Sequence, residues 1–232
     1  MERGNMTLLD DLRYLFTAPS ELFYDLDEEP RILRPFFISL LIYIINIGIA
    51  YFLGGLIAVP EETLSIEVQF IILIVLCAFV GPLLVLLVNA AQALAYFIGV
   101  KVLSYNMPYK TMLSISMYSF IILNLNKTLE TVVNSIIGKS DFFTLSPALF
   151  FANTAYSNSI ISILLKLINP FIIWYVILIV IGIHVISGMS KAKAAGVVLI
   201  GSFCLLCIAV TGFIIIGAFF ALVVSVLGGY RA

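Results

Sequence analysis

The stretch Pro170-Phe-Ile-Ile-Trp-Tyr-Val-Ile-Leu-Ile-Val-Ile-Gly-Ile-His-Val-Ile-Ser187 decides the fold class, because its eighteen residues contain no Asp, Glu, Lys or Arg. A helix of about 20 apolar residues is long enough to cross the ~30 Å hydrocarbon core of a bilayer. Comparable stretches recur along the chain. The sequence therefore predicts an all-α, polytopic transmembrane helical bundle with about five spans, near residues 36–59, 70–100, 110–124, 170–188 and 194–228.

Composition supports a membrane protein. Hydrophobic residues make up 62% of the chain and charged residues only 11%, whereas soluble domains carry about 25% charged residues. Eight of the thirteen acidic residues precede residue 30, and none lies inside a predicted span. This distribution divides the chain into a cytoplasmic amphipathic segment, residues 1–34, and a transmembrane bundle, residues 35–232. The net charge of −1 offers no basic surface for nucleic acid.

The N-terminal segment is predicted to form two short helices. The first has apolar residues at helical spacing, with Asp10, Asp11 and Arg13 on its other side; the apolar set is Leu8, Leu9, Leu12, Leu15 and Phe16. Such a helix is suited to a membrane interface or a protein partner. The second is expected to begin near Ser20 and to end before Pro30, with Phe23 and Leu26 on its apolar face.

Three of the predicted spans have unusual features. Span 70–100 is longer than one crossing requires, and a bend is expected at Gly81-Pro82 because proline removes a backbone hydrogen bond. Span 194–228 is also over-long and could bend at its glycines. Span 110–124 is the least apolar, because it contains Ser114, Ser116 and Ser119, and it is expected to continue as an amphipathic helix.

Lysine and arginine in the loops predict the orientation, because these residues accumulate in the short cytoplasmic loops of membrane proteins. With the N-terminus in the cytoplasm, eight basic residues are cytoplasmic: Arg3, Arg13, Arg31, Arg34, Lys101, Lys110, Lys191 and Lys193. Four lie on the other side: Lys127, Lys139, Lys166 and Arg231. Trp174 and Tyr175 are then expected at the outer interface. The predicted location is the plasma membrane.

Polar residues inside the spans are the candidate site residues. Asn89, Gln92 and Tyr96 share one face of a helix, beside a ridge of small residues at Ala91, Ala95 and Gly99. One interpretation is helix packing, in which each amide hydrogen bond contributes about 0.6–2 kcal/mol. The alternative is a polar cavity for a ligand or a solute. His184, near the end of its span, is expected to bond a neighbouring helix or to reach the interface rather than to act as a switch.

Catalytic and metal-binding patterns are missing from the sequence. Cys204-x-x-Cys207 has ligand-like spacing, but zinc requires about four ligands, and His184 is the only histidine. The cysteines are therefore interpreted as small apolar packing residues. The chain has no Gly-x-Ser-x-Gly or His-Glu-x-x-His motif. We expect a protein that is not an enzyme and has no cofactor or metal.

Two segments resemble the Yip1-domain family of integral membrane proteins. The first is Phe16-Thr-Ala-Pro19…Phe23…Leu26…Pro30, and the second is Ile173-Trp174…Gly182, followed by Ser190-Lys191-Ala-Lys-Ala194. The resemblance implies five spans and a cytoplasmic N-terminus. Eukaryotic members bind Rab-type GTPases and act in vesicle traffic. Their Asp-Leu-Tyr-Gly-Pro-type segment is absent here, so the chain is more similar to prokaryotic members.

Together these features favour a scaffold that works through contacts. The bilayer is its environment, the N-terminal segment would bind a cytoplasmic protein or organise lipid, and a homo-oligomer is left open. The alternative is a permease or channel component with a polar site near Asn89 and Gln92, because interrupted helices are common around the substrate sites of transporters.

Overall fold

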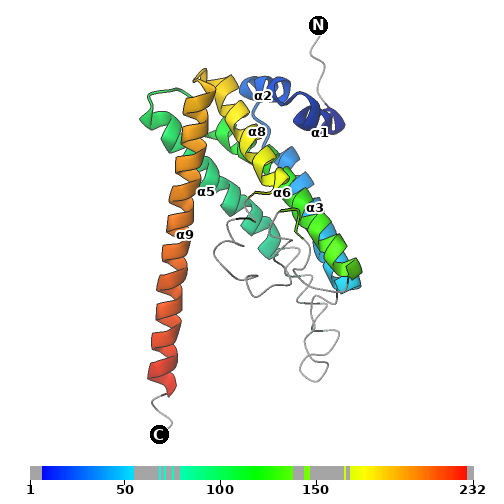
Figure 1. The fold of residues 1–232 in the computed structure, drawn as a ribbon, viewed down its shortest axis with the longest axis vertical. Coiled ribbons are helices and arrows are strands. Elements are labelled where there is room, and N and C mark those ends of the chain that lie inside the picture. The colour runs from blue at the N-terminus through cyan, green and yellow to red at the C-terminus, as the bar shows by residue number, and fades with distance from the viewer. Residues whose placement is uncertain are drawn as a thin grey trace.

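A computed structural model shows a helical bundle (Figure 1) and describes residues 7–54, 68, 71, 75, 79–137, 144–146, 165 and 168–228. Within these residues every regular element is helical, which confirms the predicted fold class. The helices are α1 (Leu8–Thr17), α2 (Pro19–Glu28), α3 (Leu33–Gly54), α5 (Gly81–Val102), α6 (Tyr109–Ile137), α8 (Pro170–Ser187) and α9 (Lys191–Gly228).

Four of these helices contain a described segment long and apolar enough to cross a membrane. These segments are Leu33–Ala50, Gly81–Val102, Pro170–Ser187 and Lys191–Ile208. They correspond to the predicted first, second, fourth and fifth spans. The fourth agrees most closely, because Asn169 accepts a hydrogen bond from the Phe171 amide and thereby caps α8 at the predicted start.

The long helices alternate in direction. Hydrogen bonds join Arg31 to Ser114 and Asn46 to Thr128, so α3 and α6 run parallel. Helix α8 runs against α6, because Asn169 lies beside Asn126 while Gly182 lies beside Ile115. Short connections reverse the chain between α5 and α6 and between α8 and α9. Helices α3, α6 and α9 therefore point one way, and α5 and α8 point the other way.

Helix α6 is the centre of the bundle. It packs most extensively against α3 and also contacts α8, α5 and α2. Its first half contains the largest group of buried residues, and the hydroxyl groups of Thr111, Ser114, Ser116 and Ser119 are inside the bundle. The predicted short span and its amphipathic continuation are one helix of 29 residues, about 44 Å long at 1.5 Å per residue. Its polar character is explained by contact with protein instead of lipid.

Two expectations about bends have different outcomes. At Gly81-Pro82 the helical geometry changes: Phe79 and Val80 are π-helical, and the α-helix α5 follows directly from Gly81. Most of residues 55–78 lie outside the described part of the chain, so the first part of the expected span 70–100 lies there too. Helix α9, in contrast, continues without interruption for 38 residues, and its second half extends beyond the other helices (Figure 1). Glycine alone does not interrupt it, because a backbone in lipid must keep its own hydrogen bonds.

Two packing expectations were wrong. Cys204 and Cys207 are exposed on α9, in a stretch of that helix where only Leu205 among residues 202–208 is even partly buried. Tyr175 is buried, with 6% of its surface exposed, and does not lie in an interfacial belt. It points into the bundle because it shares the inner face of α8 with Leu178 and Ile179.

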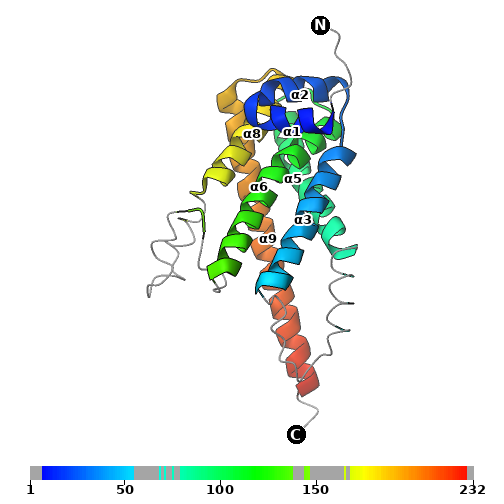
Figure 2. The same cartoon turned by 90° about the vertical axis from the view of Figure 1, so that its right-hand side faces the viewer.

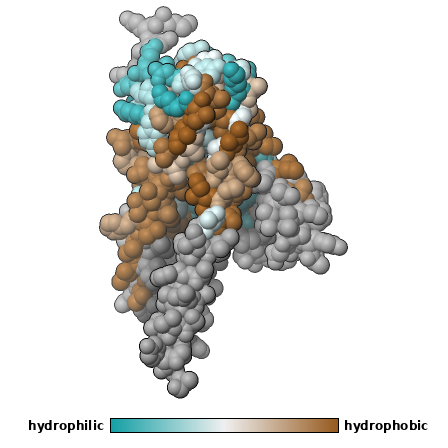
Figure 3. All heavy atoms as spheres, turned by 90° about the vertical axis from the view of Figure 1, so that its left-hand side faces the viewer, coloured by the Kyte–Doolittle hydropathy of each residue, from teal (hydrophilic) through white to brown (hydrophobic). Residues whose placement is uncertain are grey.

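The two short helices close one end of the bundle. Figure 2 shows α1 and α2 lying across the tops of the long helices, at the end where α5 joins α6 and α8 joins α9. In Figure 3 the hydrophilic surface gathers at this end, above a broad hydrophobic zone. Leu15, Leu22, Phe23 and Leu26 belong to the same buried cluster as the long helices. We call α1 and α2 the cap.

Candidate functional site

Local sequence signals position the cap. Thr7 and Asp10 form a reciprocal capping box at the start of α1: the Thr7 amide donates to the Asp10 carboxylate at 2.9 Å, and the Thr7 hydroxyl accepts from the Asp10 amide at 3.3 Å. The Thr7 hydroxyl, which donates to the Asp10 carboxylate at 2.6 Å, and then the Thr7 amide lower the pKa of the Asp10 carboxyl group, because both bonds stabilise its charged form. Pro19 then lies in the first turn of α2. Backbone N–H groups in this turn have no acceptor within the helix, so the missing N–H group of proline costs no hydrogen bond.

Burial of apolar side chains attaches the cap to the bundle. Leu22, Phe23 and Leu26 have no exposed surface, and α2 packs against α8 and α6. The predicted apolar face of α2 is thus confirmed. The prediction for α1 is only partly correct, because Leu15 is buried while Leu9 and Phe16 remain 75% and 48% exposed.

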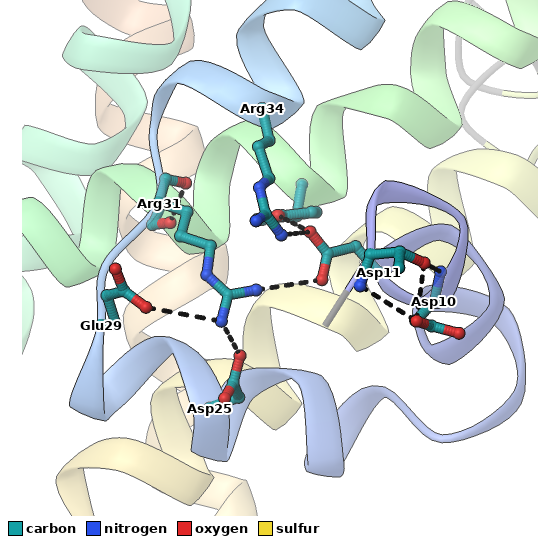
Figure 4. A network of polar contacts seen from close by, with 9 residues as sticks. Asp10, Asp11, Asp25, Glu29, Arg31 and Arg34 are labelled. Atoms are coloured by element: carbon teal, nitrogen blue, oxygen red, sulfur yellow. Dashed lines mark hydrogen bonds and ion pairs between the residues drawn. The ribbon is translucent and has the colours of Figure 1, made fainter. Parts of the chain in front are cut away.

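A buried ion cluster lies between the cap and the long helices (Figure 4). Asp11 has no exposed surface. One of its carboxylate oxygens accepts from Arg31 at 3.2 Å, and the other accepts from Arg34 at 3.2 Å and from the Tyr118 hydroxyl at 2.7 Å. The carboxylate therefore joins α1 to the segment that starts α3 and to α6. We call Asp11, Arg31, Arg34 and Tyr118 the ionic clasp.

Arg31 extends the clasp to α2 and to the centre of the bundle. Its guanidinium group also contacts the carboxylates of Asp25 and Glu29 (Figure 4). Its backbone carbonyl accepts a 2.6 Å hydrogen bond from Ser114 of α6. Arginine suits this position because its planar group presents five N–H donors and can serve several acceptors. One side chain thus fixes the positions of both cap helices relative to α6.

The sequence alone did not reveal the clasp. Asp11 was expected on the polar side of α1, but the structure buries it. The helical wheel treats any carboxylate as solvent-facing, and Tyr118 lies 107 residues further along the chain. One available signal was the pair Arg31 and Arg34, which immediately follows a strongly acidic segment.

The predicted polar residues of α5 contact three different helices. The Asn89 amide oxygen accepts from Ser116 of α6 at 3.3 Å, and its nitrogen donates to the Val85 carbonyl at 2.8 Å. Gln92 accepts from the Tyr175 hydroxyl of α8 at 2.9 Å. The Tyr96 hydroxyl lies 2.9 Å from that of Ser202 on α9. These bonds favour the helix-packing interpretation over a cavity.

Small residues bring α5 and α9 together beside these bonds. A Cβ atom on Gly99 would lie 2.8 Å from a methyl group of Val197. A Cβ atom on Gly201 would lie 2.8 Å from the Tyr96 ring. Ala95 also belongs to this contact, whereas Ala91 is exposed. The ridge of small residues therefore permits the close crossing of α5 and α9.

His184 does not join these polar residues. It is half-buried near the end of α8, and its Nδ1 lies 2.6 Å from the backbone carbonyl of Met189 in the turn to α9. Gly188 adopts φ = 69° in this turn and donates from its amide to the His184 carbonyl. A left-handed glycine is a common helix terminator, and His184 holds the turn that follows it.

Replacing Asn89 by leucine should destabilise the bundle, because Ser116 would lose its side-chain acceptor. We expect a loss of about 0.6–2 kcal/mol, measured as the midpoint of thermal unfolding in mild detergent. Leu87 of the same helix is exposed, so Leu87→Asn is a matched control with the reverse change on the outer face. Wild-type stability of Asn89→Leu would contradict the helix-packing interpretation.

The polar groups of the clasp and of α5 have partners within the protein. The clasp carboxylate and both of its arginines are paired with each other, and the α5 amides are paired across helices. Within the described ranges no group of three His, Cys, Asp or Glu residues could hold a metal ion. The outer surface of the cap remains accessible.

Comparisons with known proteins agree with the architecture. The sequence profile of the Yip1 domain matches residues 13–214. The match begins in α1, two residues after Asp11, and ends within α9; it covers α2, α3, α5, α6 and α8, with Arg31, Arg34 and Tyr118 of the clasp. No curated protein and no solved structure matches the chain.

Proposed function

This chain belongs to the Yip1-domain family of membrane proteins, and from that premise we propose that it is a non-enzymatic membrane scaffold. Its bundle contacts the lipid bilayer and presents the cap, at the cytoplasmic surface, to a protein partner. The ionic clasp is the single observation that carries this proposal. It fixes the cap in one orientation on a rigid base.

Burying charges in this way is costly, so stability alone is a poor explanation for the clasp. Apolar residues of similar volume often stabilise such a position as well as or better than an ion pair. Buried ionic groups can instead specify one geometry among several. Here the geometry specified is the orientation of α1 and α2, which supports a role in presenting a surface.

The outer surface of the cap has the composition of a contact surface. Leu9, Phe16 and Tyr24 are 75%, 48% and 59% exposed. Glu21 and Asp27, on α2, are exposed as well. Exposed apolar side chains that lie together mark contact sites, and Leu9 and Phe16, seven residues apart, share one side of α1. A partner with apolar and basic groups would complement this surface.

We also propose that all five long helices cross the membrane, with the cap in the cytoplasm. Their alternating directions support this topology. The cap, the α5–α6 connection and the α8–α9 turn lie at one end (Figure 1). Seven of the predicted cytoplasmic cations lie in these segments or in the helix turns next to them: Arg13, Arg31, Arg34, Lys101, Lys110, Lys191 and Lys193. The plasma membrane is the proposed location.

Site-directed photocrosslinking in native membranes would test the presented surface. A benzophenone amino acid is placed at Tyr24 in the cap, and the same group at Ile136, near the far end of α6 and 74% exposed, is the control. We expect a discrete protein adduct from Tyr24 that is absent from Ile136. Adducts with lipid only, or the same products from both positions, would contradict the proposal. An adduct of twice the chain mass would identify a second copy as the partner.

A further inference from the structure

Two lysines at the cap end of the bundle rest on aromatic rings. The Lys101 ammonium lies 5.6 Å from the centre of the Phe97 ring, and that of Lys193 lies 5.4 Å from the centre of the Tyr105 ring. Lys101 belongs to α5 and Lys193 to α9, and these two helices cross nearby, where Gly99 meets Val197. We call Phe97, Lys101, Tyr105 and Lys193 the lysine–aromatic cluster.

Neutral oxygens, not carboxylates, hold these lysines. Lys101 donates to the Asn106 amide oxygen at 2.9 Å, and Lys193 donates to the Tyr105 hydroxyl at 3.2 Å. The sequence has no Asp or Glu between residues 68 and 129, nor after Asp141. By contrast, Arg31 and Arg34 are neutralised by carboxylates of the cap. The positive charge of the cluster is therefore uncompensated by any neighbouring acid on its own helices.

An apolar stripe leads away from these charges along α5. Leu94, Ile98 and Val102 are 49%, 52% and 76% exposed. Their four-residue spacing places them on one side of the helix, and Val102 is adjacent to Lys101. A strip suited to an acyl chain thus ends beside Lys101, and Lys193 adds a second cation from the neighbouring helix α9. The aromatic rings restrain the lysine side chains through cation–π contacts.

We propose that the lysine–aromatic cluster binds the phosphate headgroup of an anionic glycerophospholipid, with an acyl chain along Leu94, Ile98 and Val102. Charge complementarity identifies the ligand, because two uncompensated cations at the membrane boundary attract a phosphodiester. This site is separate from the cap surface. It remains in place whether or not the cap binds a protein.

Native mass spectrometry of the full-length, delipidated protein would test this site. The protein is titrated with phosphatidylglycerol and with phosphatidylcholine of the same acyl chains. A lysine near an anionic headgroup contributes about 1 kcal/mol, so each lysine corresponds to about a fivefold change in affinity. Lys101→Gln and Lys193→Gln should each weaken phosphatidylglycerol binding about fivefold, and should leave phosphatidylcholine binding unchanged.

Lys127→Gln is the matched control, because Lys127 is an exposed lysine in the second half of α6, away from the cluster. It should retain wild-type affinity, and an equal loss there would overturn the proposal in favour of a general charge effect. Tyr105→Leu removes both contacts of Lys193 without changing the charge and should weaken binding at least twofold. Inorganic phosphate should not compete, since it lacks the acyl chain. Full competition by phosphate, or undiminished lipid binding in the double glutamine variant, would refute the lipid site.

Discussion

Replacing Asp11 by alanine is expected to lower the free energy of unfolding by about 3–5 kcal/mol, the cost of removing one member of a buried ionic cluster. Arg31, with only 11% of its side chain exposed, loses one of its three carboxylate partners and keeps Asp25 and Glu29. The Tyr118 hydroxyl, also fully buried, loses its acceptor. Arg34 contributes less, since it is 38% exposed and can be hydrated.

Thermal unfolding in mild detergent would measure the effect, together with tryptic cleavage at Arg13, which becomes faster if the cap detaches. Asp27→Ala is the matched control, because Asp27 is an exposed aspartate on the neighbouring cap helix. Adding Tyr118→Phe to Asp11→Ala should recover part of the stability, since an unpaired buried hydroxyl costs about 1–3 kcal/mol. Equal melting temperatures for Asp11→Ala and Asp27→Ala would show that the clasp does not hold the cap.

The second large effect is expected from Gly182→Ala. A Cβ atom at this position would lie 2.7 Å from Cγ2 of Ile115 and 3.1 Å from two more of its carbons. Ile115 is fully buried on α6, and its branched side chain has one strongly preferred rotamer in a helix. The helices must therefore separate, and overpacking of this kind costs about 1–3 kcal/mol.

Gly48 is the matched control for Gly182, because it is also a helical glycine but has open space around it. Gly48 lies in α3, and a Cβ atom there would have no neighbour within 4 Å. Gly48→Ala should therefore melt at or slightly above the wild-type temperature. In the double variant Gly182→Ala/Ile115→Ala, the two losses should be less than additive, because the second change removes the atoms that clash. Strict additivity would mean that the α6–α8 contact does not set the spacing.

Much of the fold could be predicted because it depends on local physics. Apolar runs defined four spans, and the prolines at 19 and 30 set the limits of α2. The 100° helical rotation correctly placed Asn89, Gln92 and Tyr96 on one face. What it could not provide was the identity of the partners, because Ser116, Tyr175 and Ser202 come from three other helices.

The remaining differences have a common physical cause. Hydropathy describes transfer into lipid, and it does not distinguish lipid from a protein interior. Tyr175 was therefore expected at the interface and is inside, whereas Cys204 was expected inside and is exposed. The burial of Asp11 depends on arginines 20 and 23 residues away. Helical periodicity relates residues three or four positions apart, so it does not reveal ion pairs over this separation.

The central position of α6 has a consequence for how the protein is made. Helix α6 is the least apolar of the five long helices, so its own partition into lipid is the least favourable. The flanking helices α3 and α8 cover it, but α8 is synthesised some 30 residues later. We therefore expect α6 to enter the bilayer late, together with α8. Biogenesis of this chain would then be cooperative across helices, and truncation before residue 170 would leave α6 poorly inserted.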